Sequence, residues 1–336
     1  MSLYRAETRR LVTRRFTKFF LVGVLVVLAT IAVGVFLSNH KSGPELVATA
    51  RANAERDFQQ QSQAAAQERA NCTAAAGTPK AANYPPDCGQ LVTPKREEYP
   101  TENYLPATFD FRKNFGDMVS ALAGLLALAA FVVGASFVGA EWNSGGMMNL
   151  LLWRPQRLRV LGAKLFALLG GLTVLTVVLS AAWTGIFLLV AKLHGSTAGM
   201  TSAAWQSIGL MELRGLGLVL AGAAIGFGLA SLGRHTAMAL GVAMGVIVVL
   251  QIGLATVLSL AKVKFVEAYL IPTWGVAWMD KTAKLEDFST CNFNAVNGCQ
   301  PATLTLTWQM AGSGLALILV VVVGASMWAM RSRDVT

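Results

Sequence analysis

The chain has 336 residues, of which 54% are apolar (AVILMFWYC) and 14% are charged. Soluble domains carry about 25% charged residues, so this composition excludes an ordinary soluble globular protein. The 32 glycines and the mean hydropathy of +0.52 are typical of a membrane protein with several spans. The formal net charge is +10, and the position of the basic residues decides whether this charge indicates nucleic acid or a membrane surface as partner.

Six stretches are long and apolar enough to cross a bilayer, which takes about 20 residues of helix. They are residues 19–37, 118–140, 165–191, 215–233, 236–261 and 307–330. In the last stretch, Trp308 and Trp328 are separated by 20 residues, which is about 30 Å of helix and matches the distance between two membrane interfaces. The sequence therefore predicts an all-α membrane protein with six transmembrane helices.

The basic residues indicate the orientation of these helices, because short cytoplasmic loops are enriched in lysine and arginine. Residues 1–18, the 141–164 loop, Arg234 and the 331–336 tail together hold 13 basic and 3 acidic residues, whereas the opposite side holds 15 of each. We therefore expect both termini in the cytoplasm and a multi-pass protein of the cytoplasmic membrane. The whole net charge then faces anionic membrane lipid, and nucleic acid is not expected as a partner.

The first 18 residues combine arginines with recurring apolar residues. This pattern predicts an amphipathic helix over residues 3–17 on the cytoplasmic surface, beside the simpler alternative of a positively charged flank. The span at 19–37 shares a basic start and an apolar core with signal peptides. It is too long for one and no small-residue cleavage pattern follows it directly, so we interpret it as an uncleaved anchor.

Two long segments are expected on the outer side. In the first, 38–117, residues 45–70 contain no glycine or proline and predict a helix, whereas 78–106 holds six prolines and predicts an irregular loop. We expect this insertion to be mostly helical. The second, 262–306, has an aromatic, apolar stretch interrupted by Pro272 that is too short to span. It fits either an interfacial or re-entrant piece or a packed extracellular cap.

All four cysteines fall on the predicted outer side, where disulfides are stable. They are Cys72, Cys88, Cys291 and Cys299. Four cysteines allow three connectivities, of which we favour the two sequence-local pairs, Cys72 with Cys88 and Cys291 with Cys299. The alternative is that they are unpaired small apolar residues.

The predicted spans contain no charged residue, which argues against a transporter coupled to protons or sodium. Gln251 is the strongest polar side chain inside a span, and it fits a contact to substrate or the more common interhelical hydrogen bond. Glu212 and Arg214, at the end of the 192–214 outer loop, are expected at the interface, unless Thr201–Leu232 forms one long helix.

The sequence holds no catalytic constellation, no cluster with metal-ligand spacing and no phosphate-binding P-loop. We therefore expect no catalytic residue, no metal and no cofactor in this chain. A membrane-embedded enzyme acting on lipid would need polar residues gathered at one interface, and the sequence shows no such group. Any ATP chemistry must come from a partner.

The 141–164 loop carries the most specific pattern in the chain. A glutamate at the end of the second span is followed by a glycine, a pair of leucines, a proline with arginines two and four residues after it, and a closing Ala-Lys. The positions are Glu141, Gly145 or Gly146, Leu150 and Leu151, Pro155, Arg157 or Arg159, and Ala163 with Lys164. The proline starts a new helix and the arginines present cations to lipid phosphates or to an acidic partner. On composition alone, the loop is equally well a positive-inside hairpin.

This pattern resembles the signature of ABC-2 type permeases, the membrane subunits of ATP-binding-cassette exporters. The six spans and the amphipathic N-terminal helix extend the resemblance over most of the chain. The chain departs from the signature at Gly146-Met147, where a threonine often follows the glycine, and its first outer segment is longer than in compact relatives.

The resemblance implies a homodimer, or a dimer with a related permease, bound to cytoplasmic ABC ATPase subunits that hold ATP and Mg. It implies that the loop docks on the ATPase, with the coupling residues Glu141, Trp142, Met147, Arg154, Arg157 and Arg159. Two glycine pairs, Gly241 with Gly245 and Gly222 with Gly226, fit close helix packing at a dimer axis or within the chain.

Our leading hypothesis is the permease subunit of an ABC exporter, moving an amphipathic or hydrophobic substrate such as a drug, a lipid or a hydrophobic peptide. The charge-poor spans favour such a cargo over a small ion. The alternative is a membrane sensor or scaffold that binds a ligand through its outer segment without transport.

Overall fold

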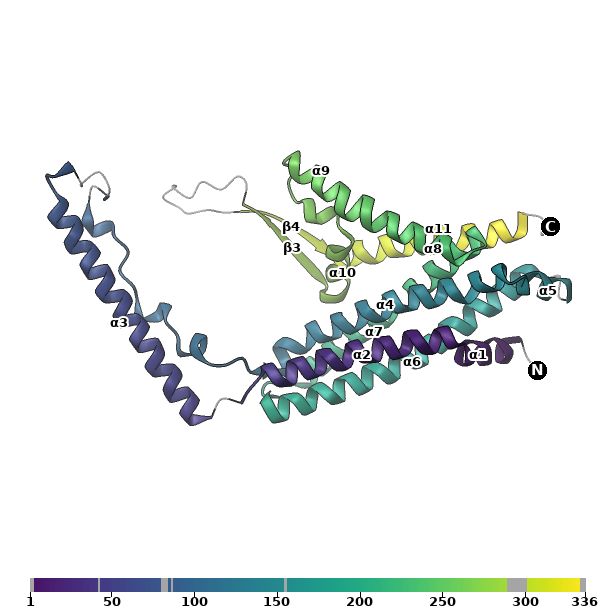
Figure 1. Ribbon diagram of the computed structural model, residues 1–336, viewed down its shortest axis with the longest axis horizontal. Coiled ribbons are helices and arrows are strands. Elements are labelled where there is room, and N and C mark those ends of the chain that lie inside the picture. The colour runs from purple at the N-terminus through teal and green to yellow at the C-terminus, as the bar shows by residue number, and fades with distance from the viewer. Residues whose placement is uncertain are drawn as a thin grey trace. The chain divides into compact units, whose positions relative to one another are not determined.

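The computed structural model describes residues 3–41, 43–79, 84–85, 87–153, 156–288 and 301–332. Within these ranges, six helices are long and apolar enough to cross a membrane, which confirms the predicted all-α membrane fold (Figure 1). They are α2 (Arg15–Ser38), α4 (Phe111–Asn143), α6 (Arg157–His194), α7 (Ser202–Gly233), the helix Thr236–Leu260 and α11 (Trp308–Ser332). The fifth consists of α8 (Thr236–Gly245), a π-helical stretch (η5, Val246–Gly253) and α9 (Leu254–Leu260).

Several helices extend beyond their predicted apolar stretches. A membrane limits only the apolar part of a helix, so charged turns continue it into water. Helix α7 begins after Thr201, whose hydroxyl accepts a hydrogen bond from the backbone N–H of Ala204, and it ends at Arg234 with a left-handed φ of 55°. The alternative of one long helix is therefore correct, and Glu212 and Arg214 lie inside it.

The chain forms two compact units. The core of the larger unit is the contact between α4 and α7, where glycines let the backbones approach closely. A Cβ atom built at Gly226 would lie 2.1 Å from the carbonyl oxygen of Phe131, and one at Gly222 would lie 2.6 Å from that of Ala127. These two glycines therefore serve packing within the chain. A Cβ atom at Gly241 or Gly245 would meet nothing within 4 Å.

The second predicted outer segment folds into a short helix and a hairpin (Figure 1). It contains η6 (Val266–Tyr269), α10 (Ile271–Asp280) and the antiparallel strands β3 (Thr282–Asp287) and β4 (Ala302–Thr307). Its apolar core includes Ala277, Leu285 and Leu306. Arg214 of α7 donates a hydrogen bond of 3.0 Å to the Met279 carbonyl, and Trp278 donates one of 2.9 Å to the Arg214 carbonyl. The segment is thus packed against α7, while its depth relative to a membrane stays a prediction.

The smaller unit comprises residues 34–110 and 189–197. Its main element is α3 (Pro44–Ala75), which confirms the predicted helix and extends it at both ends. In the described part of the proline-rich return, the chain forms three short 3₁₀ turns, η2 (Cys88–Gln90), η3 (Arg96–Glu98) and η4 (Thr101–Tyr104). Strand β1 (Phe109–Asp110) then pairs in parallel with β2 (Gly195–Ser196). Arg96 forms an ion pair of 3.1 Å with Glu55 on α3, so the return segment lies along the helix.

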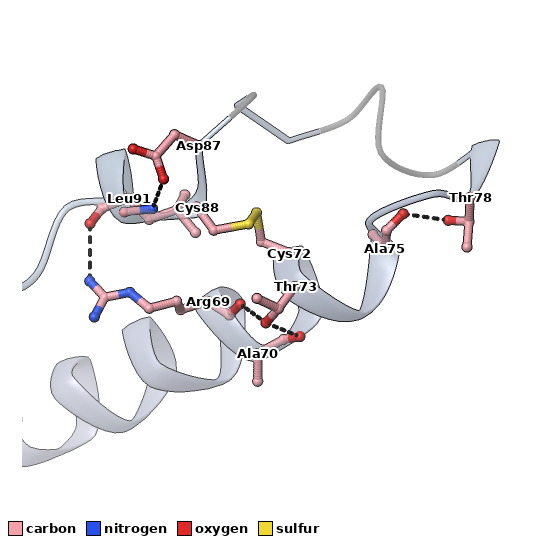
Figure 2. The surroundings of a disulfide bond; sticks show 10 residues. Arg69, Ala70, Cys72, Thr73, Ala75, Thr78, Asp87, Cys88 and Leu91 are labelled. Atoms are coloured by element: carbon pink, nitrogen blue, oxygen red, sulfur yellow. Dashed lines mark hydrogen bonds between the residues drawn. A yellow bond between two sulfur atoms is a disulfide. The ribbon is translucent and has the colours of Figure 1, made fainter.

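A disulfide connects the C-terminal end of α3 to the return segment (Figure 2). Cys72 of α3 is bonded to Cys88 of η2, with 5.9 Å between their Cα atoms, which confirms the predicted pair. Arg69 adds a hydrogen bond of 3.4 Å to the carbonyl of Leu91, as Figure 2 shows. The other predicted pair, Cys291 with Cys299, lies outside the described residues.

Candidate functional site

A short helix connects the second and third apolar helices. Helix α4 ends at Asn143, and the chain turns through Gly145, whose φ of +71° suits glycine, into α5 (Gly146–Trp153). Met147 of α5 is fully buried. The link to α6 contains Arg154 and Pro155, which lie outside the described residues.

A buried ion network lies where α1 (Leu3–Thr13), α4 and α6 meet. The ammonium group of Lys164 is fully buried, 2.7 Å from Oε2 of Glu7 and 2.6 Å from Oε2 of Glu141. Each carboxylate comes from a different helix. A buried charge is tolerated only when it is paired, so Lys164 of α6 requires both α1 and the end of α4 in place.

Two arginines surround this network. Arg10 lies 3.3 Å from Glu7 and 3.8 Å from Glu141, and Arg14 lies 3.8 Å from Glu141. Arg14 also donates hydrogen bonds to the backbone carbonyls of Ser136 (3.1 Å) and Phe137 (3.3 Å) near the end of α4. With three cations and two carboxylates the network carries a net positive charge, on the side of the chain predicted to face the cytoplasm.

The N-terminal helix packs on α6 through one stripe of its surface. A Cβ atom at Gly170 would lie 2.7 Å from the Tyr4 hydroxyl oxygen, and one at Gly171 would lie 2.8 Å from a methyl group of Leu11. Tyr4, Glu7 and Leu11 follow a spacing of three and four residues, so they share one face of α1. A helix therefore forms in the predicted region, but it ends at Thr13, and residues 15–17 belong to α2. The glycines of α6 allow the close approach of α1.

The turn between α7 and α8 packs against the end of α4. The guanidinium of Arg234 lies over the ring of Trp142, with 5.0 Å from its central carbon to the ring centroid. A Cβ atom at Gly139 would lie 2.5 Å from the backbone nitrogen of Thr236, so α4 and the start of α8 are in direct contact. The α5 region is therefore bordered by the ends of several helices.

The structure places the predicted coupling residues in two groups. Glu141 and Met147 are buried, and Trp142 is half-buried beneath Arg234. Arg159 is exposed and Arg157 is half-buried. The two arginines line an open cavity of about 430 Å³ together with Arg331 from the end of α11. The buried residues therefore hold the region together, and the arginines face its surface.

Sequence reasoning missed Glu7, Arg10, Arg14 and Lys164 as members of the site. The signal for Glu7 was present, because it is the single acidic residue among the first 18. Lys164 closes the loop pattern, but its partner on α1 depends on how the helices pack. That information is absent from the residue spacing.

Gln251, the other predicted site residue, has an internal partner. Its side-chain oxygen accepts a hydrogen bond of 2.8 Å from the backbone N–H of Ile271, the first residue of α10. It thereby connects the π-helical stretch of the fifth apolar helix to the outer helix. This is the structural role that polar residues in spans commonly have.

Six apolar helices, with a short helix and a buried ion network at one end, define a multi-pass membrane protein. Within that class, the family described as ABC-2 family transporter protein matches residues 1–335. The chain belongs to this family and is a transport permease of the membrane, as the loop pattern indicated. Among curated proteins, none matches the chain significantly.

Proposed function

We propose that this chain is the membrane subunit of an ABC exporter that moves an amphipathic or hydrophobic substrate and is driven by a separate cytoplasmic ATPase. Membership of the ABC-2 family supports the permease role and, in general, an ABC ATPase partner. The sequence has no P-loop, so in this proposal the partner subunit binds ATP and Mg. The charge-poor spans support a cargo with a large apolar part.

The observation that carries the proposal is the ion network that joins the end of α4, which leads directly into α5, to α1 and α6. Helix α5 follows α4 directly, and Glu141 in the last turn of α4 bonds to Lys164 of α6, which in turn bonds to Glu7 of α1. Because close-packed, ion-paired elements move together, a displacement of α5 by an ATPase reaches α1, α4 and α6 at once. This arrangement suits a coupling element better than it suits a passive hairpin.

The docking surface in this proposal is the exposed side of the same loop. Asn143, Asn149 and Arg159 are exposed, whereas Glu141 and Met147 face inward. Glu141 then acts by positioning the loop, and the exposed polar and basic residues contact the ATPase.

A second copy of the chain, or a related permease, is part of the proposal. The helix Thr236–Leu260 is almost unburied within the chain, and Gly241 and Gly245 on it have open space beside them. Small residues let two membrane helices approach closely, so this pair suits a dimer contact.

Affinity purification of the full chain in mild detergent tests the proposal. We expect a P-loop ATPase to copurify with the native chain and to be lost from the surface variants Asn149→Lys and Arg159→Glu. Arg51→Glu, at an exposed position on α3, is the matched control and should retain it. Absence of an ATPase from the native chain, or its retention by both surface variants, would contradict the coupling role. It would favour a sensor or scaffold.

A further inference from the structure

An apolar cavity of about 260 Å³ lies between α2, α4, α6 and α7, with α1 at one end. Its lining is almost entirely aliphatic. Representative lining residues are Leu21, Val24, Leu126, Val133, Leu172 and Leu175. The cavity lies wholly in the larger unit and shares no lining residue with the α5 surface.

The lining changes from charged to apolar along α2. Lys18, near the start of α2, is the one charged residue among the described residues that line the cavity, and Thr17 lies beside it. Val24 lies six residues further along, which corresponds to about 9 Å of helix. The cavity therefore has a cationic group at the end nearest the predicted cytoplasmic surface and an apolar interior that reaches toward the middle of the spans.

We propose that this cavity holds one acyl chain of an anionic phospholipid, with the lipid phosphate at Lys18. The aliphatic walls suit a hydrocarbon chain, which is as apolar as the leucine and valine side chains that it would contact. Lys18 lines the cavity and its side chain is exposed, so its ammonium suits a lipid phosphate and favours a headgroup with net negative charge.

The position of α1 gives this lipid a structural consequence. Leu11 and Val12 of α1 line the cavity, and Glu7 of the same helix is a partner of Lys164 in the ion network. A bound acyl chain therefore contacts the helix that the network holds. The lipid adds apolar contacts that favour the docked position of α1. This role is independent of the cargo and of the ATPase.

Native mass spectrometry of the full chain in detergent tests the proposal, with phosphatidylglycerol and phosphatidylcholine of identical acyl chains as probes. Ala129→Phe places a ring in the cavity, and Leu128→Phe, at an exposed position of the same helix, is its control. We expect Ala129→Phe to lower phosphatidylglycerol binding about tenfold or more, because the ring occupies the space of the acyl chain and accommodating both would overpack the site. Leu128→Phe should bind as the native chain does.

The headgroup is tested separately, at a position whose substitution leaves the helix packing intact. Lys18→Gln should lower the preference for phosphatidylglycerol over phosphatidylcholine about fivefold, whereas Arg15→Gln should change it less than twofold. Equal effects of these two variants, or native binding by a folded Ala129→Phe, would overturn the proposal. If Ala129→Phe fails to fold, the Lys18 and Arg15 comparison decides alone.

Discussion

Lys164 is the most buried charged residue that the structure describes. Its ammonium is fully buried between Glu7 and Glu141, at 2.7 and 2.6 Å, and also lies 5.5 Å from the ring centroid of Phe137. Breaking a buried ion pair costs about 3–5 kcal/mol, because the remaining charge stays desolvated. Arg10 and Arg14 remain near the carboxylates, so we place the cost of losing this lysine at the lower end.

Replacing Lys164 by methionine should therefore release α1. We expect Lys164→Met to speed tryptic cleavage at the exposed Arg5 and Arg9 by about two orders of magnitude, since cleavage of a helix follows its local unfolding. Mass spectrometry of the early fragments measures the rate. Lys164→Arg keeps the charge and should lie much nearer the native rate. Equal cleavage of native chain and Lys164→Met would show that α1 is held by its apolar contacts alone.

Asp280, at the end of α10, makes the outer segment sensitive to pH. Partial burial raises the pKa of its carboxyl above the ordinary 3.8, and the nearby Asp117 adds to this, while Arg214 acts in the opposite direction. Because the folded state binds the proton more tightly than the unfolded state, the carboxylate is destabilising above the raised pKa. That loss of stability disappears as the pH falls through it.

We therefore expect Asp280→Asn to raise the midpoint of thermal unfolding at pH 7 and to reduce the gain in stability that the native chain shows on mild acidification. Glu267→Gln, at an exposed position in the same segment, is the matched control and should leave both unchanged. Thermal unfolding of the detergent-purified chain between pH 4 and 7 measures the effect. A midpoint that falls at pH 7 in Asp280→Asn would mean that its pairing with Arg214 outweighs its burial.

At the scale of elements, the contact between α4 and α7 depends on glycines, which have no side chain to keep the two backbones apart. The Cβ atom of an alanine at position 226 would lie 2.1 Å from the carbonyl oxygen of Phe131, which is backbone and cannot swing aside. We expect Gly226→Ala to destabilise the chain by about 1–3 kcal/mol, the usual range for overpacking. Gly185→Ala, where nothing lies within 4 Å, is the control. Thermal unfolding of the native chain and both variants measures the effect. Equal unfolding midpoints for all three proteins would contradict this packing.

The apolar helices could be predicted from the sequence because each stretch carries its signal locally, in about 20 uncharged residues. Their ends could not, since charged turns such as Arg112 and Lys113 continue α4 outside the apolar stretch. The hairpin of β3 and β4 was also missed. The alternation in Thr303–Thr307 is only five residues long, which is too short to distinguish a strand from irregular structure by periodicity alone.

Part of the candidate site could likewise be predicted from the sequence, and part depends on how the helices pack. The loop pattern marked Glu141 and the arginines, because it is continuous in sequence. The bond between Glu7 and Lys164 joins residues 157 positions apart and arises only when α1 docks on Gly170 and Gly171 of α6. A lone acid on the apolar face of a basic helix is a usable signal for a buried partner, although it does not identify that partner.

For the whole molecule, the orientation in the membrane follows from charge. The side that carries α1, the α5 loop, Arg234 and the C-terminal tail holds the entire net charge of +10. Each lysine or arginine near an anionic leaflet contributes about 1 kcal/mol, so the sum strongly favours this side in the cytoplasm. The proposed coupling role needs the same orientation, because an ATPase reaches α5 only from the cytoplasm.

Labelling with a membrane-impermeant maleimide decides the orientation. In a Cys291→Ser, Cys299→Ser background, where the remaining cysteines form the disulfide, Gln61→Cys on α3 should react in intact cells. Asn149→Cys on α5 should react only after the membrane is permeabilised, because its side chain is exposed on the side that is predicted to face the cytoplasm. The reverse pattern would place α5 outside, where no ATPase could drive it, and the exporter proposal would fail even though the family assignment stood.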